Sequence, residues 1–245
     1  MGLGDWIMCT AQVRELNERT RVPVMVVDQS GRPQWNEVFE NNPRITRDPA
    51  TRHIRLYNSS GNRPYIRDKL KNKWVWQQWL RQPGELYLID SEEAFGTQAC
   101  GKIYIEPHTK VKGSNKAWPF SKWQQVVDSK VAEFVQCGPP GTLRLRGATF
   151  VETKSFRQAL GVLHNSAGFV GTEGGLHHAA AAMGLKAVVL WSEYIGPEIT
   201  GYDGQVNIRQ SSRTCGARLQ CYGCVKSMLA IKPEEVIQSL KDLKC

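Results

Sequence analysis

A glycine-rich segment over residues 168–184 (GFVGTEGGLHHAAAAMG) holds the residue types best suited to ligand binding. A short apolar run and an alanine-rich stretch typical of a helix flank a turn made of Thr172, Glu173, Gly174 and Gly175. Glycines let a ligand approach the backbone, and the N–H groups at a helix start favour phosphate. Glu173 could accept hydrogen bonds from a ribose or a sugar, and His177 or His178 could face the ligand. The alternative is a tight turn in which the histidines only pack.

A carboxylate near the N-terminus offers a second function. Asp5 follows Gly4, and a helix is expected behind it over Arg14-Glu15-Leu16. At a glycine-flanked turn, Asp5 could take a proton from a substrate hydroxyl as a general base. Aspartate is also a favoured helix cap, so Asp5 could simply cap the helix.

Residues 44–81 interleave basic and aromatic side chains, with ten Lys and Arg against two Asp. The aromatic members are Tyr57, Tyr65, Trp74, Trp76 and Trp79. This composition suits a polyanion that offers flat rings, such as nucleic acid, and equally a phosphorylated glycan. The alternative is a solvated helix face with its tryptophans in the core.

Seven cysteines are scattered along the chain. Cys9, Cys100, Cys137 and Cys245 stand alone, which predicts reduced thiols rather than a disulfide framework. The C-x5-C-x2-C cluster of Cys215, Cys221 and Cys224 could hold zinc, but structural zinc takes four ligands and no fourth is obvious nearby.

The elements that must position these residues alternate between strands and helices. Strands are expected over 22–28, 53–57, 85–90, 103–106, 131–137, 168–171 and 186–191. Helices are expected over 34–41, 66–80, 119–127, 156–163, 175–183 and 233–243. This alternation predicts βαβ units around a parallel sheet. The polar stretch 91–101 is the best linker, which divides the chain into an N-terminal lobe (1–95), a C-terminal lobe (96–232) and a final helix (233–245).

The composition is that of an ordinary globular protein: 245 residues, 41% apolar, 22% charged, with a net charge of +9. These values exclude disordered, collagenous and coiled-coil chains. Apolar runs are far shorter than the ~20 residues of a membrane span, and the first residues do not resemble a signal peptide. We therefore expect a cytoplasmic protein.

The segment 168–184 resembles the donor-binding motif of heptosyltransferase-like enzymes, glycosyltransferase family 9, which have the GT-B fold. Glu173 stands at the acidic position of that motif, Gly175 at its glycine position and His178 at its histidine position. Gly174 replaces the usual Ser or Thr, so the hydroxyl that would contact the donor diphosphate is missing. The backbone would have to bind the diphosphate instead.

Three further segments resemble the same family. Lys116-Ala-Trp-Pro119 is similar to its K-x-W-P box, whose lysine lies near the donor phosphates. The stretch from Gly4-Asp5 to Thr10 is similar to the opening that carries its presumed base, and residues 221–236 resemble its Cys-rich loop and final helix start. The strand that usually precedes the opening is missing, so either the fold is trimmed or the natural start lies upstream.

The resemblance implies an α/β, GT-B-like fold with two Rossmann-like lobes, parallel sheets, an interdomain cleft and a reduced N-terminal lobe. It implies inverting transfer from a nucleotide-diphosphate sugar to an acceptor hydroxyl, with Asp5 as base. The donor would be bound by Lys116, Thr172, Glu173, Gly174, Gly175 and His178. The acceptor would be bound by Gly4, Thr10, Arg67, Lys71, Lys73, Trp74 and Trp76. No cofactor or metal is expected, because the sequence contains no Asp-x-Asp.

The expected acceptor is polyanionic. The family default is a bacterial surface glycan, often phosphorylated, and the alternative is a hydroxymethylated pyrimidine in DNA, as glycosylated by phage enzymes. A third possibility is a non-catalytic nucleic-acid-binding protein that uses the same basic stretch. Binding to duplex DNA with a steep salt dependence would distinguish a DNA enzyme from a glycan enzyme.

Overall fold

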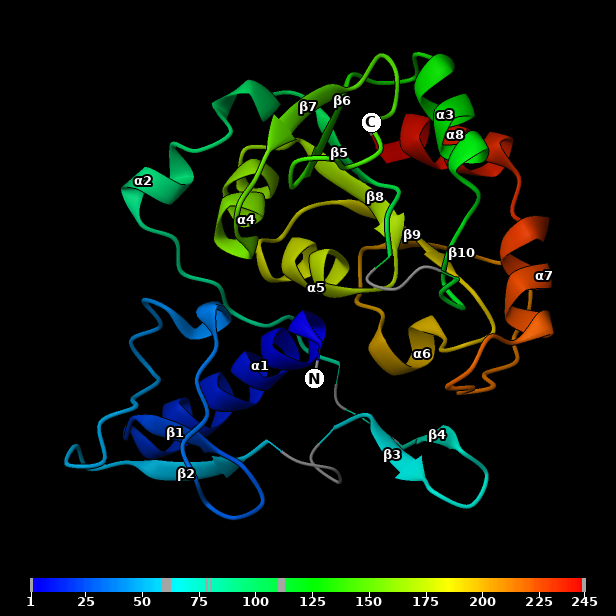
Figure 1. The fold of residues 1–245 in the computed structure, drawn as a ribbon. Helices are drawn as coiled ribbons and strands as arrows, with labels where there is room; N and C mark the ends of the chain where they lie inside the picture. Colours follow the sequence, from blue (N-terminus) through cyan, green and yellow to red (C-terminus); the bar gives the residue numbers. More distant parts are fainter. Residues whose placement is uncertain (1, 59–62, 78, 80, 110–112, 244–245) are drawn as a thin grey trace.

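The centre of the fold is a six-stranded parallel sheet (Figure 1). The computed structural model describes residues 2–58, 63–77, 79, 81–109 and 113–243. The strands are β5 (Ile103–Glu106), β6 (Phe134–Gly138), β7 (Thr149–Glu152), β8 (Gly168–Thr172), β9 (Ala187–Trp191) and β10 (Val206–Arg209). Their order is β10-β9-β8-β5-β6-β7, which is the doubly wound order with its switch point between β5 and β8.

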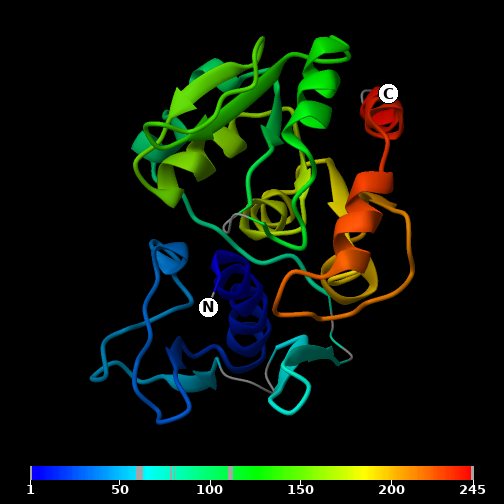
Figure 2. The same cartoon turned by 45° about the vertical axis from the view of Figure 1, so that its right-hand side comes forward.

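Helices cover both faces of this sheet (Figure 2). One face carries α4 (Phe156–His164) and α5 (Gly175–Ala182); the other carries α3 (Phe120–Asp128), α7 (Tyr222–Ala230) and α8 (Pro233–Leu243). Successive strand residues alternate between the two cores, so that Phe169 packs with the first set and Val170 with the second. Strands buried on both faces explain the continuous apolar runs of the sequence. The short helix α6 (Pro197–Thr200) follows β9.

The N-terminal part is small and packs directly on the sheet domain. It consists of α1 (Leu3–Thr20), β1 (Val24–Val27), the 3-10 helix η1 (Glu37–Phe39) and β2 (Ile54–Tyr57), with β1 and β2 parallel. Helix α1 lies against α5, and the side chains of both belong to one hydrophobic core. The expected α/β fold with a reduced N-terminal lobe is therefore confirmed. The two parts share buried surface.

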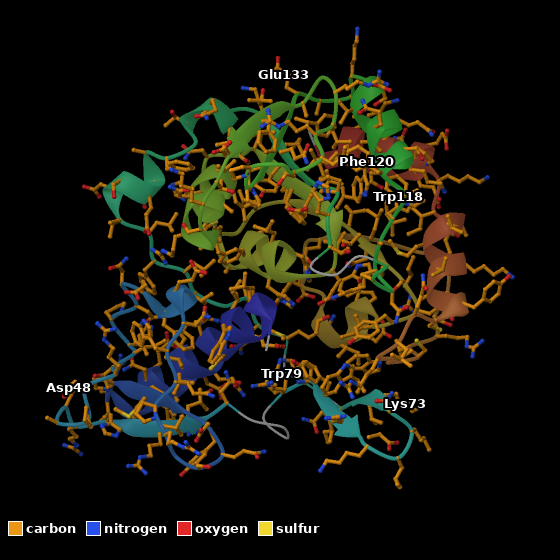
Figure 3. The ribbon with its side chains drawn as sticks, viewed as in Figure 1. Asp48, Lys73, Trp79, Trp118, Phe120 and Glu133 are labelled. Atoms are coloured by element: carbon orange, nitrogen blue, oxygen red, sulfur yellow. The ribbon has the colours of Figure 1, made fainter. Side chains whose placement is uncertain are left out.

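The expected helix over 66–80 is not present in the residues that the structure describes; Gln78 and Leu80 lie outside them. The chain instead forms an antiparallel hairpin of β3 (Tyr65–Asp68) and β4 (Lys73–Trp76). The helical spacing of Ile66 and Leu70 is coincidental, because these side chains are 42% and 99% exposed. Aromatic and β-branched residues favour strands, and Asn72 makes the turn with a φ of 47°. Figure 3 shows Lys73 on this hairpin at the edge of the molecule, with Trp118 and Phe120 beside α3.

Two further expectations are also corrected. Residues 85–90 form no strand, because the backbone there pairs with side chains instead: the Glu85 N–H donates to Thr10, and Arg157 donates to the Tyr87 carbonyl. The polar stretch 91–101 contains α2 (Asp90–Glu93) and the 3-10 helix η2 (Thr97–Ala99). Both pack on α4, so this segment is a docked part of the sheet domain.

The remaining expected elements are present with shifts of a few residues at their ends, and the expected helix 233–243 matches α8. The sequence-based expectation omitted β7, β10, α6 and α7, which are short or lie in stretches without a clear apolar period. No helix among the described residues is long and apolar enough to cross a membrane.

We expect Leu70→Glu to change the free energy of unfolding by less than about 0.5 kcal/mol, because the side chain is exposed at the hairpin turn. If residue 70 lay on the buried face of a helix, the same change would cost about 2–5 kcal/mol. Urea unfolding followed by circular dichroism measures the difference. A loss above about 2 kcal/mol would contradict the hairpin.

Candidate active site

The candidate site lies at the switch point of the sheet, where the chain leaves β5 and β8 toward opposite faces. Ligands of doubly wound proteins bind outside the carboxyl ends of the strands at this point. Glu106 is the last residue of β5, and Glu173 directly follows Thr172 at the end of β8. Thr172 and Glu173 are both buried, and Gly174 is the first residue of this turn that is partly exposed. The fold therefore brings two carboxyl groups and a glycine turn to one edge.

Three of the expected donor-binding residues meet in one cluster. The Nζ of Lys116 donates to Oε2 of Glu173 at 2.6 Å, and Nε2 of His178 lies 3.3 Å from Oε1 of the same carboxylate. Glu173 is only 8% exposed. Burial disfavours its charge, but Lys116 and His178 outweigh this effect and lower the pKa of Glu173. The carboxylate is thus ionised and held by two partners.

The histidines at the start of α5 have different environments. Nδ1 of His178 lies 2.7 Å from the hydroxyl of Tyr202, and Nε2 of the same ring faces Glu173. His177 contacts Gln205 at 2.9 Å, and burial together with His178 lowers the pKa of His177 to about 3. His178 therefore belongs to the cluster, and His177 is a neutral packed side chain at pH 7.

The first turns of α1 and α5 touch. A Cβ atom at Gly4 would lie 2.5 Å from Cδ2 of His178, so only glycine fits there. A Cβ atom at Gly175 would lie 3.2 Å from Cβ of Leu3. Gly4, expected to bind acceptor, therefore allows the close approach of the two helices. Their positive ends converge on one region, which favours an anion.

Asp5 lies in the first turn of α1, at the edge of this region. Its Oδ2 accepts a hydrogen bond from the Gly2 N–H at 2.7 Å, so one carboxylate oxygen caps the start of α1. Its Oδ1 accepts from the hydroxyl of Tyr65. The ammonium of Lys116 lies 5.5 Å from the centre of the Tyr194 ring, so this ring lies beside the Glu173 cluster. Burial, followed by the charges of Glu173 and Asp5, raises the pKa of Tyr194.

The hairpin places an aromatic group over Asp5. Tyr65 packs edge-on against Trp74 and Trp76 at 5.0 and 6.1 Å between ring centroids, and Trp76 contacts Tyr194 at 5.6 Å. Of the expected acceptor residues on this hairpin, Trp74 and Trp76 pack in the aromatic group, Arg67 and Lys71 are exposed, and Lys73 is partly buried.

Thr10, also expected to bind acceptor, is fully buried on α1. Its hydroxyl donates to the Ile7 carbonyl and accepts from the Glu85 N–H, both at 2.7 Å. The Thr10 hydroxyl therefore uses both its donor and its acceptor capacity on backbone groups. The structure therefore gives Thr10 a packing role and does not bring it to the Glu173 cluster.

A cavity of about 670 Å³ opens beside the cluster, at the carboxyl ends of β5, β6 and β7. Its lining includes Glu106, His108, Thr153, Ser155 and Leu176. Leu176 lies in the first turn of α5, so the cavity reaches the start of that helix. Burial raises the pKa of Glu106 to about 8, despite a hydrogen bond from the His108 N–H. A carboxyl group in this state can both donate and accept hydrogen bonds.

Sequence reasoning missed four polar residues of this region: Tyr65, Glu106, Tyr194 and Tyr202. Glu106 could have been found, because it ends an expected strand next to the glycine-rich one. The three tyrosines carry no spacing signal.

Among the residues that the structure describes, two groups have metal-ligand geometry, with donor atoms within 4.8 Å of one another. In the group of Glu173, His177 and His178, the ammonium of Lys116 already neutralises the carboxylate. In the other, Cys215, Cys221 and Cys224 bring three sulfurs together, one fewer than structural zinc takes. Cys215 and Cys224 are free thiols 3.2 Å apart, and the hydrogen bond from Cys224 lowers the pKa of Cys215 to about 6. Cys9, Cys100 and Cys137 are free as expected; Cys245 lies outside the described residues.

Comparison with solved structures identifies the fold. A glycosyl transferase family 9 protein from Veillonella parvula superposes with a TM-score of 0.66 and 14% identity, over 99% of this chain and 94% of the other. The ADP-heptose LPS heptosyltransferase II of E. coli gives a TM-score of 0.51 and 18% identity, over 69% of this chain and 54% of the other. The chain thus spans about half of that second protein. No protein-family model and no curated protein matches the sequence. The chain has the fold of family 9 glycosyltransferases.

We expect Lys116→Met to lower the free energy of unfolding by about 2–3 kcal/mol at pH 7, because it leaves Glu173 buried without its cation. Wild-type Glu173 has a lowered pKa, so its contribution is complete above the unfolded value of about 4.3 and disappears as the pH falls further. The difference in the free energy of unfolding between Lys116→Met and the wild type should therefore become smaller as the pH falls. Adding Glu173→Gln should restore most of the loss at pH 7, as measured by urea unfolding. An equal gap at pH 7 and pH 3 would contradict the ion pair.

Proposed function

We propose that the chain is a cytoplasmic, metal-independent, inverting glycosyltransferase that uses a nucleotide-diphosphate sugar. The observation that carries this proposal is the cluster of Lys116, Glu173 and His178 at the start of α5, located at the switch point of a family 9 fold. This place combines a cation, the start of a helix and a buried hydrogen-bond acceptor. The combination suits a phosphorylated sugar better than a neutral ligand.

The donor occupies two adjoining regions in this proposal. Its nucleoside lies in the cavity at the ends of β5, β6 and β7, where Glu106 offers hydrogen bonds. Its diphosphate lies at the N-terminus of α5, which the cavity reaches at Leu176. Glu173 and Lys116 bind the sugar and the phosphates. The related E. coli enzyme is named for ADP-heptose, which supports a nucleotide-diphosphate sugar as the donor class.

The reaction is a single displacement. The acceptor oxygen forms a bond to the anomeric carbon on the face opposite the diphosphate, and the bond from that carbon to the diphosphate oxygen breaks. The acceptor proton passes to the Asp5 carboxylate. The nucleoside diphosphate leaves with the bonding electrons, and Lys116 and the helix N–H groups stabilise the charge that develops. Attack from the opposite face inverts the configuration.

The acceptor approaches from the side of Asp5 and the hairpin. Tyr65, Trp74 and Trp76 provide aromatic surface there, and Arg67, Lys71 and Lys73 provide positive charge. Aromatic and cationic groups together suit a phosphorylated bacterial surface glycan. The same exposed cations favour DNA containing hydroxymethylated pyrimidine as the second candidate.

The test is a mass-spectrometric screen of nucleotide sugars against phosphorylated glycans and hydroxymethylated duplex DNA, with and without EDTA. We expect transfer from one donor class, unchanged by EDTA and with inverted anomeric configuration. Failure of every donor to bind or react would contradict the proposed function. A strict requirement for added magnesium or manganese would contradict the role of Lys116. Transfer to DNA would replace the glycan as acceptor.

Gly174 offers a direct test of the diphosphate position. Its φ of 168° is open to any residue, and a Cβ atom there would meet nothing closer than 3.9 Å. We expect Gly174→Ser to bind nucleoside diphosphate about tenfold more tightly, because its hydroxyl adds a hydrogen bond to a charged group. Gly174→Val should bind at least about tenfold more weakly, because a branched side chain occupies the phosphate position.

Calorimetry measures the affinity of both Gly174 variants for nucleoside diphosphate. The nucleoside without phosphates is the control ligand, and its affinity should not change. Gly175 is less suitable, because a side chain there would also push against α1. Equal diphosphate affinity for all three proteins would mean that the diphosphate binds elsewhere.

Asp5→Asn tests the base. Asparagine keeps an oxygen for the Gly2 N–H but does not take up the acceptor proton. We expect a melting temperature and donor affinity near wild type and a loss of turnover of at least about a hundredfold. A variant that turns over at the wild-type rate would show that Asp5 only caps α1.

A further inference from the structure

The carboxylate of Asp5 is held on two sides by groups from different parts of the chain. The Gly2 N–H, in the same helix start, donates to Oδ2 at 2.7 Å. The hydroxyl of Tyr65, 60 residues away on β3, donates to Oδ1. Because the hydrogen bond from Gly2 is local, it is present whenever α1 forms. The hydrogen bond from Tyr65 depends on the hairpin being in place.

The hairpin fixes the orientation of the Tyr65 ring. Trp74 and Trp76 contact the ring from β4, and the register pairs Tyr65 directly with Trp76. The backbone of β4 is bound in turn to the loop after β10, where the Trp74 N–H donates to the Gly216 carbonyl at 2.8 Å. A left-handed Gly216 lets this loop approach, since a Cβ atom there would lie 2.0 Å from the Trp74 carbonyl oxygen. The phenol is thus held from both strands and from the sheet domain.

The Tyr65 hydroxyl is suited to donating and not to ionising. Burial and the adjacent Asp5 carboxylate raise the pKa of Tyr65 well above its ordinary value, and Arg63 offsets this only in part. The phenol therefore keeps its proton throughout the pH range in which an enzyme works. A hydrogen bond from a neutral donor favours the charged form of the carboxylate that accepts it.

We propose that Tyr65 is a positioning residue for the general base: its hydroxyl holds the Asp5 carboxylate in the orientation in which it faces the acceptor. This inference rests on the proposed function, in which Asp5 takes the acceptor proton. Each carboxylate oxygen has two acceptor sites, so Asp5 can keep both protein donors and still accept from a substrate hydroxyl. The hairpin therefore contributes to catalysis in addition to offering charge to the acceptor.

Other titratable groups face the same region and must be separated from Tyr65 in any measurement. They are Arg63 beside the Tyr65 hydroxyl, Tyr194 after β9, His178 against Gly4, and Glu173 and Lys116 behind Tyr194. Tyr65→Phe removes one hydroxyl and leaves all of these in place. The matched control is Tyr222→Phe, whose side chain is 82% exposed at the start of α7.

The experiment compares the wild type, Tyr65→Phe, Asp5→Asn, their combination and Tyr222→Phe. We expect Tyr65→Phe to reduce kcat about tenfold and to leave donor KM within about twofold, because the lost hydrogen bond orients the base and does not contact the donor. Adding Tyr65→Phe to Asp5→Asn should cost nothing more, because a residue that acts through Asp5 has no role without it. Tyr222→Phe should match the wild type.

A kcat that Tyr65→Phe leaves unchanged, or losses that multiply in the double variant, would overturn the positioning role. The NMR chemical shift of the Asp5 carboxyl carbon at pH 7 gives the same answer without any acceptor, since loss of the hydrogen bond from Tyr65 should move it. An unchanged chemical shift would overturn the proposal. Absence of transfer by the wild type would contradict the proposed function instead, and the NMR comparison would still decide whether the Tyr65 hydroxyl binds the Asp5 carboxylate. Circular dichroism melting confirms that the variants fold.

Discussion

The candidate site depends on one buried carboxylate. Glu173 lies among apolar strands and remains charged because Lys116 and His178 both contact it. An unpaired charge in such a place would cost several kcal/mol, so the loop after β5 and the turn after β8 must come together for the domain to be stable. The ion pair that stabilises this edge of the sheet is also the one that places an ammonium group beside the start of α5. Stability and ligand recognition therefore depend on the same contact.

The stability of the small N-terminal part also depends on how it packs against the sheet domain. Because α1 lies against α5, the reduced lobe can bury its apolar side chains in the core of the sheet domain, which compensates for having only two strands of its own. The contact requires a glycine at Gly4, where any larger side chain would collide with His178. This packing fixes Asp5 relative to the Glu173 cluster. Asp5, the proposed base, and the proposed donor site are thus held together by buried surface.

The hairpin shows where local patterns mislead. Ile66, Leu70 and Trp74 have the spacing of a helix face, yet the first two are exposed. The aromatic residues that do pack, Tyr65, Trp74 and Trp76, find their partners across the hairpin and on the sheet domain. A helix of this composition would have had to bury its tryptophans without those partners. Tertiary contact therefore overrode the apparent period.

Local sequence alone determined the doubly wound sheet domain and much of its donor site. Continuous apolar strands, the glycine turn at Gly174 and the K-x-W-P box at Lys116 are each readable over a few residues, and neighbouring strand ends must meet. Only the tertiary structure decided that Thr10 supports the backbone, that Glu106 lines a cavity, and that Tyr65 reaches Asp5. The roles of Tyr65 and Thr10 depend on contacts between residues 60 and 75 positions apart, respectively. Such contacts leave no period in the sequence, because they are set by how whole elements pack and not by the spacing along any one of them.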